Sequence, residues 1–275
     1  MLQAPPPTAP VPSPSPAASV MQELILAMEQ ATVLVAEPPG PGLRTNATGF
    51  LVSDPLPDGA PRVVLVTAEH AFDRIPEDQV RVGLHIHKAD GSWGYTAALL
   101  PLRSGGKPLW TRHPVRDIAV LAVQVPPEVA RQAIPLAWLA DGDAFARYDI
   151  GPGDEMRSLG FPEGLGSSPL MFPILRLGHV ASYPLGPLTV EPAFLVDMSV
   201  TNGDSGGPVF LAKRPTGAPD TPPDPIVAGV LTQQITPNGE HIGLAMITYA
   251  VFVREALQLL DQPAPAVSPA PVGPP

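Results

Sequence analysis

The sequence predicts an all-β fold that ends in one helix, and two observations lead to this prediction. Between about residues 32 and 250, short apolar runs are separated by segments rich in Gly, Pro, Asn and Asp, a pattern typical of strands joined by turns. In residues 251–260, apolar side chains recur at helical spacing, so an amphipathic helix is expected there. The chain of 275 residues is long enough to bury the core of such a fold.

The two ends are expected to lie outside the folded domain. The chain has 40 prolines, and many of them stand in residues 1–19 and 262–275. Proline fixes φ and has no N–H, so these segments are expected to be disordered or polyproline arms. The folded domain is therefore expected to occupy residues 20–261.

The first half of the domain is expected to hold one group of strands. A helix is expected over 20–30, where Met21, Leu24, Ile25 and Met28 recur at helical spacing. Strands are then expected, in order, over 32–35, 48–52, 63–70, 80–87, 93–100 and 118–125. A connection over about 126–154 leads to the second half.

The second half repeats the pattern of apolar runs and turns. Strands are expected, in order, over 156–162, 174–180, 194–198, 209–211, 226–231 and 243–247. The proline-rich residues 214–225 are expected to form a hairpin loop, and the helix over 251–260 ends the domain.

The most informative motif is residues 203–208, which read Gly-Asp-Ser-Gly-Gly-Pro. Ser205 offers a hydroxyl nucleophile, and the backbone N–H groups of Gly203 and Ser205 can converge on one point where an oxyanion would form. Gly206 and Gly207 allow a tight turn and leave room for a substrate chain. Alone, such a glycine-rich turn is weak evidence, because these residues are common in turns.

Two upstream residues strengthen the motif. His70 ends an apolar run through Thr67, Ala68 and Glu69, and Asp117 opens Asp-Ile-Ala-Val-Leu. His, then Asp, then Ser is the chain order of the chymotrypsin-type triad, which differs from the orders found in subtilisin and the α/β-hydrolases. In this order and local context, the three segments resemble trypsin-like serine proteases, closest in style to cysteine-free bacterial domains of the HtrA type.

The resemblance, which spans roughly residues 32–261, implies a fold and an activity. It implies two packed six-stranded antiparallel β-barrels, at about 32–125 and 155–250, followed by the C-terminal helix. It implies a serine endopeptidase that acts through an acyl-enzyme, with His70, Asp117 and Ser205 as the triad and the N–H groups of Gly203 and Ser205 as the oxyanion hole. The alternative is a catalytically silent relative that uses the cleft as a peptide-binding module.

Asp204 raises a question about activation. In zymogen-type members of the resembled family, the corresponding carboxylate pairs with a new N-terminal amine that begins Ile-Val-Gly-Gly. Residues 20–23 read Val-Met-Gln-Glu, which is not that start. The full chain is therefore expected to be active without cleavage, and Asp204 is expected to have another partner, to be solvated, or to brace its own loop.

The resemblance also gives candidate specificity residues. Ser199 is expected at the base of the first specificity pocket, with Thr232, Gln234 and Ala245 along its walls. An uncharged, small or medium side chain is therefore expected before the cleaved bond. A shifted loop would bring Asp197 into the pocket and favour Arg or Lys instead.

The resemblance implies a polypeptide substrate, and the composition argues against two other kinds of partner. The formal net charge is −10, which argues against a nucleic-acid partner, and no apolar run reaches membrane-spanning length. No cofactor motif stands out, and the pair His85 and His87 lacks a third metal ligand, so no metal is expected. No secretory signal is visible, which favours a cytoplasmic over a secreted or periplasmic location, while the oligomeric state stays open.

Overall fold

The computed structural model describes residues 16–39, 46–56 and 58–261. The arms expected over 1–19 and 262–275 therefore lie outside the described residues, except that residues 16–19 form the first turn of helix α1 (Pro16–Ala31). The start of this helix is four residues earlier than the sequence predicted.

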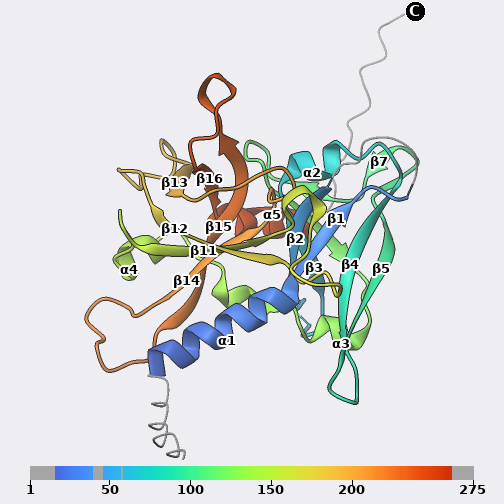
Figure 1. Cartoon of the computed structure of the whole chain (residues 1–275), viewed down its shortest axis with the longest axis horizontal. Helices are drawn as coiled ribbons and strands as arrows, with labels where there is room; N and C mark the ends of the chain where they lie inside the picture. Colours follow the sequence, from blue (N-terminus) through green and yellow to red (C-terminus); the bar gives the residue numbers. More distant parts are fainter. Residues whose placement is uncertain (1–15, 40–45, 57, 262–275) are drawn as a thin grey trace, which may run out of the picture.

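The first half of the chain forms an eight-stranded sheet, seen on the right of Figure 1. The strands pair in the order β5-β4-β1-β2-β3-β9-β8, and β10 pairs with β2. Their bounds are β1 Thr32–Ala36, β2 Asn46–Ser53, β3 Val63–Thr67, β4 Gln79–His87, β5 Trp93–Pro101, β8 Thr111–Arg112, β9 Ala119–Val123 and β10 Ile134–Pro135. The short strands β6 (Arg103–Ser104) and β7 (Lys107–Pro108) form a separate hairpin, and the short helices α2 (Glu69–Asp73) and α3 (Pro127–Ala130) follow β3 and β9.

The second half forms a closed six-stranded barrel in the order β11-β12-β13-β16-β15-β14, seen on the left of Figure 1. Its strands are β11 Glu155–Gly160, β12 Ile174–Val180, β13 Ala193–Asp197, β14 Pro208–Lys213, β15 Asp224–Ile235 and β16 Leu244–Tyr249. Helix α4 (Ala144–Arg147) precedes the barrel and helix α5 (Val251–Leu260) follows it. The proline-rich loop between β14 and β15 connects two antiparallel strands, as a hairpin requires.

The mostly β fold, the closed second barrel and the C-terminal helix confirm the predicted fold class. The first half differs from the expected closed six-stranded barrel, because its pairing follows an open path from β5 to β8 among the described residues. The strand expected over 63–70 is also shorter: β3 ends at Thr67, opposite Ala119, where its partner β9 begins. Beyond that point the chain has no ladder partner, and His70 lies in α2 instead of at a strand end.

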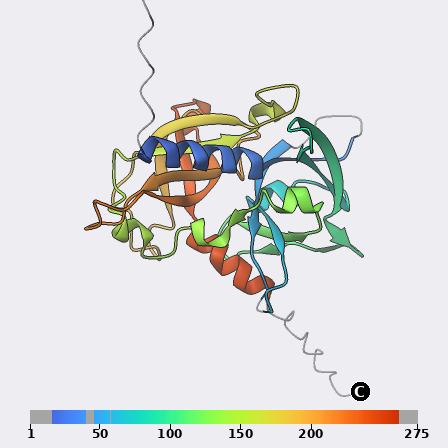
Figure 2. The same ribbon diagram turned by 90° about the horizontal axis from the view of Figure 1, so that it is seen from below.

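Two helices pack against both halves of the fold. Helix α1 contacts β14 and β15 of the second barrel and β1 and β2 of the first sheet, and α5 contacts β8 and β9 of the first sheet and β16 of the barrel. Figure 2 shows α1 lying across the strands of the second barrel, with α5 on the opposite side. Leu24 and Met28 of α1 are fully buried in the core shared by the two halves, and Phe252 and Leu257 of α5 are buried in the same core. Full burial of a side chain of this size contributes about 1.5–3 kcal/mol, so both helices are integral parts of the fold.

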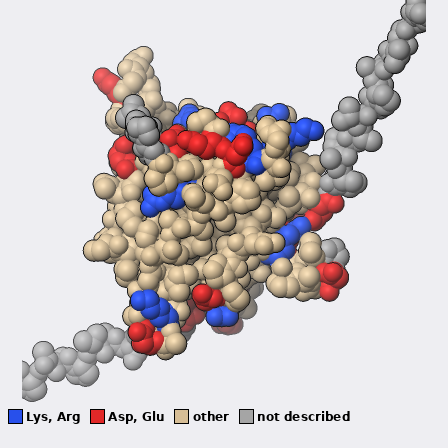
Figure 3. Space-filling model, turned by 90° about the vertical axis from the view of Figure 1, so that its right-hand side faces the viewer, with Lys and Arg blue, Asp and Glu red and all other residues tan. Residues whose placement is uncertain are grey.

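The surface carries few charges. The face shown in Figure 3 is mostly uncharged, with acidic and basic side chains gathered toward its edges, in keeping with a charged content of 15%. In the part of the chain that the structure describes, no helix is long and apolar enough to cross a membrane.

Candidate active site

A cavity of about 420 Å³ collects residues from both halves of the fold. The first half contributes His70, Arg74 and Asp117 to its lining, and the second half contributes 200–202, Ser205, 231–234 and Thr236. The segments that carry His70, Asp117 and Ser205 are far apart in the sequence, and they meet around this cavity.

His70 and Asp117 are joined by two hydrogen bonds. The imidazole Nδ1 lies 2.6 Å from one carboxylate oxygen of Asp117, and the backbone N–H of His70 donates to the other at 2.9 Å. His70 stands in the first turn of α2, and Asp117 lies in the turn just before β9, closed by a bond from Ile118 N–H to the Arg116 carbonyl at 2.8 Å. Because both carboxylate oxygens are engaged, the orientation of the imidazole is fixed by the fold.

The electrostatics of this pair favour an ionised Asp117. Burial raises the pKa of the Asp117 carboxyl, but the hydrogen bonds from the imidazole and backbone N–H of His70 lower it more. The pKa therefore lies below its ordinary value. An anionic Asp117 favours the tautomer with a proton on Nδ1 of His70, which leaves Nε2 as the basic ring nitrogen.

The loop that carries Ser205 depends on two glycines with left-handed backbone. Gly203 has φ of +95° and Gly206 has φ of +89°, a region in which L side chains are strained. A Cβ on Gly203 would clash with the carbonyl oxygen of Phe161, and a Cβ on Gly206 would clash with Thr48 and Thr67. Steric clashes therefore explain why the motif has glycine at both positions.

Thr48 of β2 holds the Ser205 loop against the first half of the fold. Its backbone N–H donates to the Ser205 carbonyl at 2.8 Å, and its hydroxyl donates to the Gly203 carbonyl at 2.7 Å. The same hydroxyl accepts from the Phe161 N–H at 3.0 Å; Thr48, Phe161 and Gly203 are buried, and Ser205 is half-buried. One buried threonine thus fixes the nucleophile loop relative to the half of the fold that carries His70.

The backbone donors of the loop divide into two groups. The N–H groups of Asp204, Gly206 and Gly207 donate to carbonyls of Thr201, Leu231 and Asp204, at 3.2, 2.7 and 3.0 Å. The N–H groups of Gly203 and Ser205 donate to no acceptor among the described residues. The Ser205 hydroxyl lines the cavity and makes no hydrogen bond to His70 in this part of the chain.

Asp204, the residue between these donors, has an internal partner. Its side chain is 3% exposed, and one oxygen lies 3.3 Å from Nε of Arg176 on β12 and accepts from the Thr201 N–H at 2.9 Å. The other oxygen has no hydrogen-bond partner among the described residues. Burial raises the pKa of the Asp204 carboxyl, and the Thr201 N–H and Arg176 oppose that rise without cancelling it.

Of the candidate specificity residues, some line the cavity and others lie outside it. Thr232 and Gln234 line the cavity, and the Gln234 amide contacts the imidazole of His241 across the β15–β16 hairpin. Ala245 is fully buried opposite Gln234 on β16, outside the cavity lining.

The structure places Ser199 outside the cavity. Side chains of the extended segment 196–200 alternate between the interior and solvent, so Asp197 and Ser199 share the exposed side. Val200, the next inward residue, is buried and lines the cavity in the place expected for Ser199. Asp197 therefore does not supply a carboxylate to the cavity either.

Sequence reasoning missed three contributors to the site: Arg74, Thr48 and Arg176. Arg74 was missed because a strand was expected over 63–70, whereas in the structure α2 places Arg74 one helical turn beyond His70. The other two could not be found from the sequence, since the bonds of Thr48 to the nucleophile loop and of Arg176 to Asp204 connect elements that no local pattern brings together.

The two strand histidines do not form a metal site. His85 is buried, stacks on Phe172 with ring centroids 4.0 Å apart, and lies 3.0 Å from the Met171 carbonyl. His87 is exposed and packs beside Trp93. Within residues 16–39, 46–56 and 58–261, no group of three His, Cys, Asp or Glu side chains is placed to hold a metal ion.

Comparisons with known proteins identify the family of the chain. The family model for the trypsin-like peptidase domain matches residues 47–214, more than half of the chain. No curated protein shows significant similarity to this chain.

Three solved structures are similar to the chain at low sequence identity. They are the serine endoprotease from Yersinia pestis (18% identity, TM-score 0.53, covering 91% of this chain and 68% of that one), the HtrA-type protease AlgW with decapeptide (18%, 0.49, 87% and 66%), and the Rv3671c protease from M. tuberculosis in its active form (19%, 0.48, 96% and 96%). This chain thus spans about two thirds of the length of the first two. The Yersinia pestis structure supports the fold, and the family match, together with the sequence motifs, shows that the chain belongs to the trypsin-like peptidase family and is a serine-type endopeptidase.

Proposed function

We propose that this chain cleaves polypeptides through a His70–Asp117–Ser205 triad and an acyl-enzyme intermediate. The observation that carries the proposal is the bond of 2.6 Å between His70 and Asp117 at the edge of the cavity that also contains Ser205. The N–H groups of Gly203 and Ser205, which have no acceptor in the described part of the chain, add donors for an oxyanion.

The first half of the reaction forms the acyl-enzyme. Nε2 of His70 takes the hydroxyl proton as Oγ of Ser205 attacks the peptide carbonyl carbon, and the carbonyl π electrons move onto oxygen. The N–H groups of Gly203 and Ser205 stabilise that oxyanion, each contributing about 2.7–4 kcal/mol. Anionic Asp117 stabilises the imidazolium, which then gives its proton to the leaving amine as the C–N bond breaks.

The second half restores the enzyme. His70 removes a proton from water, the resulting hydroxide attacks the acyl carbon, and a second oxyanion forms in the same place. Its collapse breaks the bond to Oγ of Ser205, which regains the proton from His70, and the carboxylate product leaves. No metal or cofactor takes part in this sequence of steps.

The acyl-side wall of the cavity favours an uncharged side chain. The second half of the fold lines the cavity with Val200, Leu231, Thr232 and Gln234, none of which is charged. A buried Arg or Lys of a substrate would meet no carboxylate there, and its desolvation would go uncompensated. We therefore expect small or medium neutral residues before the cleaved bond.

Cleavage of an unfolded polypeptide and of fluorogenic peptides by the purified full chain tests the proposal. Ser205→Ala and His70→Ala should each lower kcat by about 10⁴-fold or more, because the members of a triad act as a unit. Ser104→Ala, at an exposed serine on β6, is the matched control and should leave the rate unchanged. Tight peptide binding without turnover in the unmodified chain would favour the peptide-binding module instead.

A further inference from the structure

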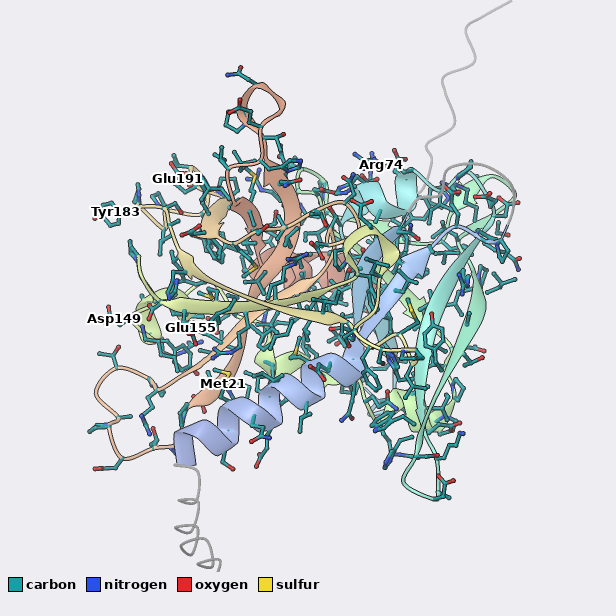
Figure 4. The ribbon with its side chains drawn as sticks, viewed as in Figure 1. Met21, Arg74, Asp149, Glu155, Tyr183 and Glu191 are labelled. Carbon is teal, nitrogen blue, oxygen red and sulfur yellow. The ribbon has the colours of Figure 1, made fainter. Side chains whose placement is uncertain are left out.

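Among the described residues, Arg74 is the one Arg or Lys side chain in the lining of the active-site cavity. It follows the last residue of α2, and its backbone N–H donates to the His70 carbonyl at 3.2 Å, so it stands one helical turn beyond His70. Figure 4 labels it at the α2 edge of the molecule, where its side chain is exposed.

The guanidinium of Arg74 forms no ion pair or hydrogen bond with the described residues, unlike many of the other arginines. Arg62 pairs with Asp54 and Asp261, for example, and Arg147 pairs with Asp141. In a chain of net charge −10, an uncompensated cation at the cavity is therefore distinctive.

The neighbouring carboxylates are used elsewhere or point away. Asp117 is bound to His70, and Glu69 lies 4.0 Å from the guanidinium of Arg112. Asp73 directly precedes Arg74, and adjacent residues on a helical turn do not face one another. The cation of Arg74 is thus available to a ligand in the cavity.

We propose that Arg74 forms a subsite for an acidic side chain of the substrate, on the leaving-group side of the cleaved bond. The inference rests on the proposed function. There, His70 gives a proton to the leaving amine, so the residues after the cleaved bond lie next to His70 and along α2. One helical turn rises about 5.4 Å, and an extended peptide rises about 3.3 Å per residue, so Arg74 reaches about the second residue after the cleaved bond. The preferred substrates are therefore polypeptides with Asp or Glu within the first three positions after that bond.

The test uses peptides that are identical except for Glu, Gln or Lys at one of these three positions. At low salt the unmodified chain should cleave the best Glu peptide about 2–5-fold faster in kcat/KM than its Gln counterpart, as expected of an exposed ion pair. Arg74→Gln should bring the Glu-to-Gln ratio of kcat/KM to about 1, and Arg74→Glu should shift the preference to the Lys peptide. Raising the salt to about 1 M should also shrink the ratio, because the charges are exposed.

A matched control and a second readout separate this inference from the proposed function. Arg131→Gln, at an exposed arginine that follows α3, should keep the Glu preference, because α3 lies at the opposite end of the first sheet from α2 (Figure 1). Binding of the same peptides to Ser205→Ala, measured by fluorescence anisotropy, gives the Glu-to-Gln ratio even if no turnover occurs. Equal handling of Glu and Gln peptides, in cleavage and in binding, would overturn the subsite, as would a Glu preference that survives Arg74→Gln. Absence of turnover with an intact binding ratio would instead contradict the proposed function alone.

Discussion

Loss of Arg176 should destabilise the protein strongly, because it leaves Asp204 buried without a counter-charge. The Asp204 side chain is 3% exposed, and without Arg176 it keeps one hydrogen bond to the residues that the structure describes, from the Thr201 N–H. Breaking a buried ion pair by removing one partner costs about 3–5 kcal/mol. Since the Arg176 side chain is 23% exposed, we expect Arg176→Gln to lower the free energy of unfolding by the smaller figure, about 3 kcal/mol. For a domain of this size, that corresponds to a fall in Tm of about 6–12 °C.

The pH dependence of this effect identifies Asp204 as its source. Burial already raises the pKa of Asp204 above its ordinary value of 3.8, and loss of the Arg176 charge raises it further. When the pKa of a carboxyl is higher in the folded than in the unfolded state, the free energy of unfolding is greatest below the unfolded-state pKa. It falls as the pH rises through the folded-state pKa. The difference between Arg176→Gln and the unmodified chain should therefore shrink as pH falls from 7 toward 4.

Urea denaturation followed by tryptophan fluorescence at several pH values measures the effect. Arg157→Gln is the matched control: Arg157 pairs at 2.5 Å with Glu155, whose side chain is 44% exposed, so its loss should cost no more than about 1 kcal/mol. The double change Arg176→Gln with Asp204→Asn should be less destabilising than Arg176→Gln alone, since no buried charge is left. A loss below about 1 kcal/mol for Arg176→Gln, or one independent of pH, would refute the reasoning.

Three further substitutions test the loop and the triad. Thr48→Val leaves the Gly203 carbonyl and the Phe161 N–H buried without partners, so urea titration should show a loss of about 1–3 kcal/mol, mostly restored by Thr48→Ser. Gly203→Ala should abolish peptidase activity, since a Cβ there meets the Phe161 carbonyl at positive φ, whereas Gly217→Ala, at positive φ but in open space, should leave kcat/KM unchanged. Asp117→Asn should leave the fold intact by circular dichroism but lower kcat about 10⁴-fold at pH 7, because it favours the wrong imidazole tautomer.

Local sequence patterns made two elements predictable to the residue. The apolar spacing of 251–260 gave both ends of α5, and the segment 174–180 coincides with β12. The five-residue helix α2 was missed because it is too short to show a helical period, and its place is set by the end of the β3–β9 ladder. The open path of the first sheet likewise depends on pairing between distant strands, which local patterns do not specify.

The candidate site shows the same division between local and long-range information. His70, Asp117 and Ser205 could be picked out because each stands in a distinctive local motif, and the structure brings all three to one cavity. Ser199 was expected at the pocket by counting back from Ser205, but the alternation of the extended chain turns it to solvent. The partner of Asp204 could not be predicted, because Arg176 reaches it only through the closure of the second barrel.

Covalent labelling of Ser205 tests the central claim most directly. The full chain, without N-terminal trimming, is incubated with a fluorophosphonate, and the adduct is located by intact and peptide mass spectrometry. The triad predicts one adduct, on Ser205, that is absent in Ser205→Ala and forms far more slowly in His70→Ala. No adduct on the folded, untrimmed chain, or an adduct on another residue, would contradict the account.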